Sequence, residues 1–204
     1  TPEAVIRALH IKGFANVEAL ASVLLASPDA VGPVAQALLE DGRLKTMGDM
    51  FSLSEEGRAI GAELHASDRA TLTEEIAEKA LDGFLPLDSR MKEIVTAWQM
   101  REVDGEQALN DHSDEGYDRA VLERLLDLHD AASSWLEPLP DGLPRLRLYS
   151  RRLDRAVKRI SAGDHAYIAS PRIDSYHNVW FELHEDLIQL AGRTREEETE
   201  AGRA

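Results

Sequence analysis

The stretch Arg43-Leu-Lys-Thr-Met-Gly-Asp-Met-Phe-Ser-Leu-Ser-Glu-Glu-Gly-Arg58 decides the fold expected for this chain of 204 residues. Two short runs typical of β-strands, residues 44–46 and 50–53, flank Gly48-Asp49. This pair tolerates the positive φ angles of a tight hairpin turn. Ser54 then follows as a helix N-cap, with two glutamates in the first helical turn, where carboxylates interact favourably with the helix dipole. The stretch therefore predicts a strand, a turn, a second strand and a helix.

The residues before this stretch predict three helices. Apolar residues recur at helical spacing from Pro2 to Leu9, again after Asn16, and a third time after Ser27-Pro28. The third helix ends at Glu40-Asp41-Gly42, because glycine is the favoured residue just past a helix end. The expected order is helix, helix, helix and β-hairpin.

This order, and two motifs within it, resemble the winged-helix transcriptional regulators of the MarR and PadR type over about residues 3–66. One motif, Leu38-Leu-Glu-Asp-Gly-Arg-Leu44, leads into the hairpin, which is the wing of such proteins, and the other, Phe51-Ser-Leu-Ser-Glu-Glu-Gly-Arg58, leaves it. The resemblance implies that the third helix enters the DNA major groove beside the wing. The candidate DNA contacts are Gln36, Arg43, Lys45 and Arg58.

The charge of this segment departs from the pattern of a DNA-binding module. No lysine or arginine lies between Lys12 and Arg43, and residues 1–66 carry five basic against nine acidic side chains, a net charge of −4. A module held to DNA by phosphate contacts normally has the opposite sign. A winged helix that contacts only proteins is therefore the alternative, whereas a homodimer would double the positive patch at the wing.

Composition limits which kinds of chemical site and which cellular locations remain possible. The whole chain has a net charge of −15 and no cysteine, which excludes disulfides, thiolate catalysis and cysteine-bound zinc. We expect neither a membrane span nor a signal peptide, since no apolar run approaches the required length, and so we expect a cytoplasmic protein.

Beyond residue 66 the apolar spacing predicts an all-helical continuation. Residues 67–86 are expected to form a connecting helix or linker, interrupted at Gly83 and Pro86. Residues 87–204 are expected to form an all-α bundle that dimerises, binds a ligand, or does both. Its helices are predicted at about 88–101, 117–136, 143–161 and 175–191, and the only strands expected are those of the wing.

One helix of this second part carries a basic cluster. Arg147, Arg151 and Arg155 repeat along one edge, together with further basic residues between 145 and 159. Arginine offers two parallel donors to a carboxylate or phosphate, so these three are candidate ligands of an anion. The alternative is that the cluster pairs with acidic side chains of neighbouring helices, namely Glu74, Glu75, Glu78, Glu123 or Asp127.

The last long helix supplies the other candidate ligand-binding residues, His177, Trp180 and His184. The two histidines share one stripe about two turns apart, roughly 10 Å, which is too far for both to hold one metal ion from this helix alone. His129 or a carboxylate from another helix could join either of them. The alternative is that both histidines are hydrogen-bonded core residues.

The acidic loop at residues 110–118 does not have the spacing of an EF-hand, and is expected to be solvated. No phosphate-binding loop or nucleophile elbow occurs, so neither an enzyme, a resident metal nor a cofactor is expected. The expected function is a ligand-responsive transcriptional regulator that binds DNA, a small anionic effector and a second copy of itself. The alternatives are a protein-interaction module without DNA contact and a helical metal- or ligand-binding protein or enzyme.

Overall fold

The computed structural model describes residues 1–103, 105–139 and 144–202, and it is mainly helical. The N-terminal part contains three helices and a small sheet: α1 (Pro2–Lys12), β1 (Phe14–Ala15), α2 (Val17–Leu24), α3 (Pro28–Glu40), β2 (Leu44–Met47) and β3 (Met50–Leu53). Helix α4 (Glu55–Ala70) leads from it to the helical part. That part comprises α5 (Glu74–Gln99), β4 (Met100–Val103), β5 (Glu106–Leu109), α6 (Glu115–Leu136), the short 3₁₀ helix η2 (Pro144–Leu146), α7 (Arg147–Ser161), α8 (Ala166–Ala169), α9 (Tyr176–Leu190) and α10 (Arg195–Glu200).

The sheet of the N-terminal part is antiparallel, with the strand order β1-β3-β2. Gly48 adopts a φ of 64° in the β2–β3 turn, as the sequence predicts. Ser54 caps α4 by accepting a hydrogen bond from the backbone N–H of Gly57. Gly57 itself must be glycine, since a Cβ there would lie 2.0 Å from the carbonyl oxygen of Arg43. Backbone contact therefore explains the glycine in the Ser-Glu-Glu-Gly motif.

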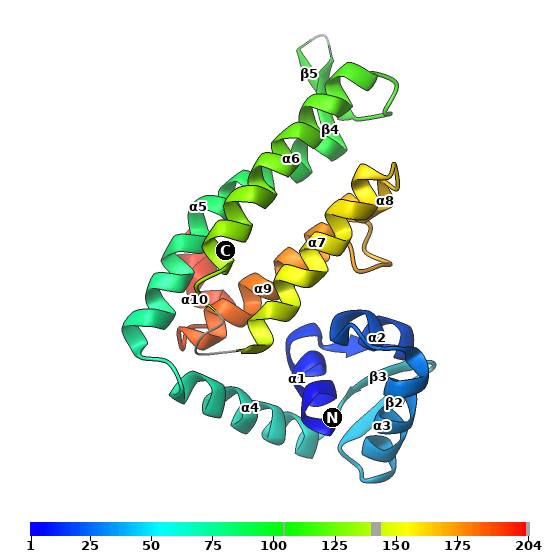
Figure 1. The fold of residues 1–204 in the computed structure, drawn as a ribbon, viewed down its shortest axis with the longest axis vertical. Helices are drawn as coiled ribbons and strands as arrows, with labels where there is room; N and C mark the ends of the chain where they lie inside the picture. Colours follow the sequence, from blue (N-terminus) through cyan, green and yellow to red (C-terminus); the bar gives the residue numbers. More distant parts are fainter. Residues whose placement is uncertain (104, 140–143, 203–204) are drawn as a thin grey trace.

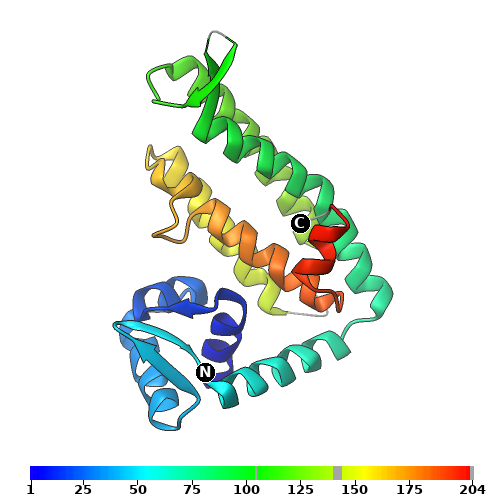
Figure 2. The ribbon, with the colours of Figure 1, turned by 180° about the vertical axis from the view of Figure 1, so that it is seen from behind.

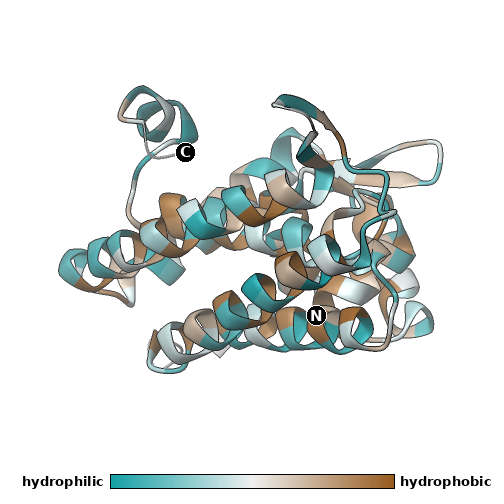
Figure 3. Ribbon diagram, turned by 90° about the horizontal axis from the view of Figure 1, so that it is seen from above, coloured by the Kyte–Doolittle hydropathy of each residue, from teal (hydrophilic) through white to brown (hydrophobic). Residues whose placement is uncertain are grey.

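Two separate hydrophobic clusters stabilise the two parts. One lies among α1, α2, α3 and the sheet, with Ile6, Leu20 and Leu38 fully enclosed. The other joins α5, α6, α7 and α9 around Phe84, Leu128 and Trp180. Figure 3 shows hydrophobic and hydrophilic residues alternating along these helices, as expected where each helix buries one face.

The helical part is built from two long pairs, α5 with α6 and α7 with α9 (Figures 1 and 2). The N-terminal part packs against the α7–α9 pair, whereas α5 and α6 lie on the far side of that pair. Consequently α7 and α9 have one side toward the hydrophobic core of the helical part and another toward α1, α2 and α4. These two helices, together with the covalent link from α4 to α5, therefore connect the two parts.

The predicted interruption at Gly83 and Pro86 is wrong, because α5 runs unbroken through both residues. The chain breaks earlier, at residues 71–73, where Thr73 caps α5 by accepting from the backbone N–H of Ile76. Gly83 serves close packing instead: a Cβ there would lie 2.8 Å from Nε1 of Trp135 on α6. The segment 67–86 is thus the end of α4 and the first half of α5.

Several short elements escaped prediction. The expectation that strands occur only in the wing is wrong, since β1 joins the first sheet and β4 and β5 form a separate antiparallel hairpin. Helix α7 begins at Arg147, after the 3₁₀ turn. Residue 143, where this helix was predicted to begin, lies outside the described residues. A capping box between Thr194 and Glu197 begins α10.

None of the helices in the described ranges is by itself long and apolar enough to cross a membrane. The pair α2 and α3 reaches that length only when joined, and it is bent by 115°.

Candidate functional site

The outer surface of α3 is the first candidate site, because it faces away from the helical part (Figure 1). Its exposed side chains include two carboxylates and no lysine or arginine; they are Pro28, Asp29, Ala30, Pro33, Gln36, Ala37 and Glu40. Gln36, the one predicted base-reading residue, donates a hydrogen bond to Glu40 at 3.0 Å. The helix that would meet DNA therefore offers it mainly small apolar groups and negative charge.

The three predicted phosphate contacts lie beside this helix rather than on it. Lys45 is exposed on β2, and Arg43 is half-buried where β2 begins. Arg58 on α4 is also exposed, and it donates to the backbone carbonyl of Leu53 at 3.2 Å. The tip of the hairpin carries an apolar side chain, Met47, which is 82% exposed, next to the exposed carboxylate of Asp49.

A second candidate site is a cluster of buried charges where the two parts meet. At its centre, Asp186 on α9 is fully enclosed and accepts hydrogen bonds from His65 on α4 and from Tyr149 on α7, at 3.0 and 2.9 Å. Arg145 forms a two-pronged ion pair with the same carboxylate. Arg145 also donates to Asp68, which in turn pairs with Arg7 on α1. One aspartate thus links η2, α4 and α7.

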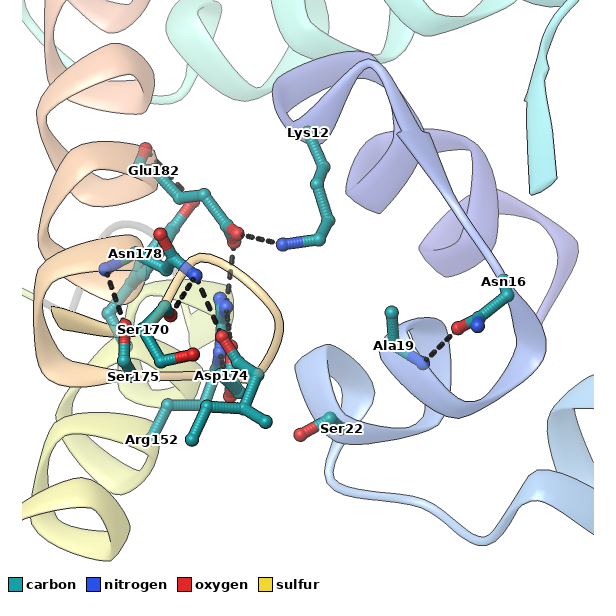
Figure 4. A network of polar contacts seen from close by, with 12 residues as sticks. Lys12, Asn16, Ala19, Ser22, Arg152, Ser170, Asp174, Ser175, Asn178 and Glu182 are labelled. Carbon is teal, nitrogen blue, oxygen red and sulfur yellow. Dashed lines mark hydrogen bonds and ion pairs between the residues drawn. The ribbon is translucent and has the colours of Figure 1, made fainter. Parts of the chain in front are cut away.

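A second branch of the cluster centres on Arg152, which is 1% exposed (Figure 4). Its guanidinium donates to Asp174 and, at 2.7 Å, to Glu182 on α9. Lys12, the last residue of α1, reaches across from the N-terminal part to Glu182, with 2.6 Å between Nζ and Oε1. Arg155 extends the branch by donating to Asp174 and to Ser22 of α2. We call the two branches together the ionic junction.

The charged groups of the ionic junction all have a counter-charge, although Nε of Arg155, at the edge of the network, is buried without a hydrogen-bond partner in the described structure. Burial disfavours the charged form of Asp186, but the charge of Arg145 and the hydrogen bonds from His65 and Arg145 outweigh it and hold its pKa at about 2. Burial also disfavours the charged form of Asp174, but the hydrogen bond and the charge of Arg152 outweigh it, so the pKa of Asp174 is lowered. Burial and the neighbouring Asp186 raise the pKa of Tyr149, so its phenol stays protonated and donates. Asp186 and Asp174 therefore remain ionised under neutral conditions.

A cavity of about 270 Å³ lies beside the ionic junction. Its walls are mostly apolar side chains of α1, α2 and α7, and its polar lining comes from junction residues. Those polar groups already satisfy one another, as the hydrogen bonds of Arg145, Tyr149 and Arg152 show. A ligand entering this cavity would have to displace existing bonds.

A third candidate site is a smaller cavity of about 190 Å³ between α5, α9 and α10, which we call the histidine cavity. It is lined by Asp88, Met91, Lys92, His177, Trp180, Phe181, His184 and Arg195. It contains all three candidate residues that the sequence placed on the last long helix. Burial lowers the pKa of both His177 and His184, so neutral imidazoles line it at neutral pH.

Two buried nitrogens on the wall of the histidine cavity lack a hydrogen-bond partner within the described residues. They are Nε2 of His184, a residue only 3% exposed, and an Nη2 atom of Arg195. Nδ1 of the same imidazole lies 3.7 Å from Oδ1 of Asp88, and Nε of Arg195 donates to Glu185 at 2.8 Å. An unsatisfied buried donor or acceptor typically costs about 1–3 kcal/mol, so each invites a partner.

The candidate arginines are not brought together with the candidate histidines. Arg147 and Arg151 are exposed on α7, and Arg155 belongs to the ionic junction. The predicted alternative, that the basic helix pairs with acidic neighbours, applies to Arg155, although its partner is Asp174 rather than any of the five acids expected. His129 pairs with Asp154 and contacts Tyr176, so it does not join either histidine of α9.

The residues that matter most at the ionic junction were missed: Arg145, Arg152, Asp174, Glu182 and Asp186. A partial signal existed, because Glu182 and Asp186 lie one turn apart in α9, each directly followed by an apolar leucine of the buried face. The loop at residues 110–118 is held by bonds among Asn110, His112 and Asp118. Across the described part of the chain, no group of three or more suitable side chains is placed to hold a metal ion.

Comparison of the chain with protein families, with curated proteins and with solved structures finds no match. The proposals below therefore rest on the residues and geometry of this chain alone.

Proposed function

We propose that the N-terminal part is a winged-helix module that binds another protein, held in a fixed orientation by the helical part. The order of α1, α2, α3 and the β2–β3 hairpin supports the winged-helix assignment. The single observation that carries the function is the exposed face of α3, where Asp29 and Glu40 stand among small apolar residues without a cation. Such a face repels DNA phosphates and suits a protein surface.

The charge around α3 indicates what kind of protein would bind. Exposed carboxylates flank it on the following turn, the hairpin and the start of α4, at Asp41, Asp49, Glu55 and Glu56. Complementary charge favours encounter and selects partners. The partner should therefore present a basic surface, with an apolar contact for Met47, whose side chain is 82% exposed at the tip of the hairpin.

Affinity capture from the source organism tests this proposal, using the full chain as bait and comparing charge-reversed variants. The double variant Asp29→Lys with Glu40→Lys should lose the captured partner, because it reverses the proposed contact face. The matched control, Glu123→Lys with Asp127→Lys, changes the same charge at exposed positions of α6 and should retain it. Equal capture by both variants would contradict the proposed face.

A second candidate function, a DNA-binding regulator, is favoured by one observation. The outer side of α3 and the hairpin are left uncovered by the helical part, with Lys45 and Arg58 exposed beside them. Fluorescence anisotropy with a mixed-sequence DNA duplex at low salt separates the two functions. DNA-binding proteins bind non-specifically at low salt and weaken steeply as salt rises. Salt-sensitive binding that Arg43→Glu with Lys45→Glu removes would establish DNA as the target and overturn our first proposal.

A further inference from the structure

The histidine cavity combines an apolar wall with two buried, unpartnered nitrogens. Met91, Trp180 and Phe181 supply apolar lining, while His184 and Arg195 supply the nitrogens. Small-molecule sites typically have this character, with hydrophobic walls and a few convergent polar groups. The cavity is distinct from the ionic junction, where every charged group described above already has a partner.

We infer that the histidine cavity binds a small monocarboxylate, whose oxygens accept hydrogen bonds from Nε2 of His184 and Nη2 of Arg195. A short aliphatic chain of the ligand would contact the aromatic wall. This inference is independent of what the N-terminal part binds.

The charges around the cavity favour a monoanion over a phosphate dianion. Lys92 already pairs with Asp88, and Arg195 already pairs with Glu185, so the fixed charges cancel. Arg195 also lies over the ring of Phe181, with 4.3 Å between its guanidinium carbon and the ring centroid, which fixes the direction of its donors. A single added negative charge can be balanced by one proton on His184, whereas a dianion would need a second proton, on His177, against the burial that disfavours its charged form.

His184 is placed to take up that proton. Its surroundings include Asp88 and Lys92 on α5, Glu185 on its own helix, Arg195 on α10, and the ring of Phe84, whose centroid lies 5.0 Å away. In the free protein, burial keeps the imidazole neutral. A bound carboxylate at Nε2, together with Asp88 near Nδ1, would favour the doubly protonated ring. Binding should therefore be accompanied by proton uptake and weaken as pH rises.

Isothermal titration calorimetry of the full chain with butyrate tests this inference. Wild type should bind saturably at millimolar butyrate, about tenfold more tightly near pH 6 than near pH 8. His184→Leu should weaken binding about tenfold or more near pH 6 and remove the pH dependence, and Arg195→Gln should weaken it about as much. The matched control Arg151→Gln removes an exposed arginine of α7 and should change nothing.

Thermal unfolding of each variant establishes that it is folded before its affinity is compared. The inference is overturned if wild type does not bind butyrate saturably, or if folded His184→Leu binds it as wild type does. Inorganic phosphate is titrated in parallel. Tighter binding of phosphate than of butyrate would overturn the assignment to monocarboxylates.

Discussion

The ionic junction and the histidine cavity both bury charged and polar side chains against α9, yet they differ in one respect. In the junction, Asp186 is enclosed and accepts from three side chains on three different elements. In the cavity, Nε2 of His184 is enclosed and has no partner in the described structure. The difference lies in whether the enclosed central group is satisfied, as Asp186 is and His184 is not; burial alone does not separate a network that holds the two parts together from a place that a ligand can fill.

The largest expected effect comes from removing the central charge of the junction. Asp186→Asn should lower the free energy of unfolding by about 3 kcal/mol, the lower end for breaking a buried ion pair, because Arg145 keeps only Asp68 as a counter-charge. Urea unfolding followed by circular dichroism measures this change. Asp127→Asn, the same substitution at an exposed position of α6, should stay within about 0.5 kcal/mol of wild type. Equal, small losses in both variants would show that the junction contributes little.

Lowering the pH should remove the contribution of the same carboxylate to the free energy of unfolding. The pKa of Asp186 is about 2, below the value near 3.9 of an unfolded aspartate, so the unfolded chain takes up a proton first as pH falls. The stability from this group is therefore present above about pH 5 and is lost toward pH 2. It amounts to about 2 kcal/mol, and Asp186→Asn should lack that part of the pH dependence. Urea unfolding at a series of acidic pH values gives both profiles, and parallel profiles would contradict the assignment.

The peripheral contact of the junction should matter less than its centre. Lys12→Met removes the ion pair with Glu182 but keeps the aliphatic stem, and Glu182 still accepts from Arg152. The expected loss is about 1 kcal/mol, because Lys12 is partly solvated and its carboxylate partner is not left alone. A loss as large as that of Asp186→Asn, measured in the same urea series, would mean that the two branches of the junction are strongly coupled.

The smallest expected effect on stability is at the histidine cavity. His184→Leu removes an imidazole whose Nε2 has no partner, and it leaves Asp88 bonded to Trp180 and Lys92. Its free energy of unfolding should lie within about 1 kcal/mol of wild type, and an increase is compatible with the loss of an unsatisfied buried group. A loss above about 3 kcal/mol in urea unfolding would show that His184 is a structural residue like Asp186.

Local patterns predicted local structure well and distant pairing poorly. The β2–β3 hairpin and the cap at Ser54 depend on neighbours within a few residues, and both are confirmed. The unbroken path of α5 could not be foreseen, because Gly83 reads as a helix breaker until Trp135 of α6 is known to lie against it. The short strand β1 depends on its pairing with β3, in which Ala15 lies opposite Phe51, 36 residues later in the sequence. Periodicity carries little information about such a distant pairing.

The candidate sites show the same contrast, because residues within one helix could be grouped from the sequence and residues on different helices could not. His177, Trp180 and His184 were found together because they share one helix, and one cavity does contain them. Arg195 and Lys92 come from other helices and were not assigned to that site. The exposed Arg147 and Arg151 were selected because a charge stripe is visible in a sequence, whereas the burial of Arg145 and Arg152 is decided by tertiary packing.

Scanning calorimetry of wild type, Asp186→Asn and His184→Leu, each with and without butyrate, tests this division most directly. We expect Asp186→Asn to unfold at a lower temperature but still to be stabilised by butyrate, since its cavity is intact. We expect His184→Leu to unfold close to the wild-type temperature and not to respond to butyrate. The opposite pattern, with His184→Leu destabilised and Asp186→Asn unresponsive, would contradict the distinction between a complete junction and an incomplete site.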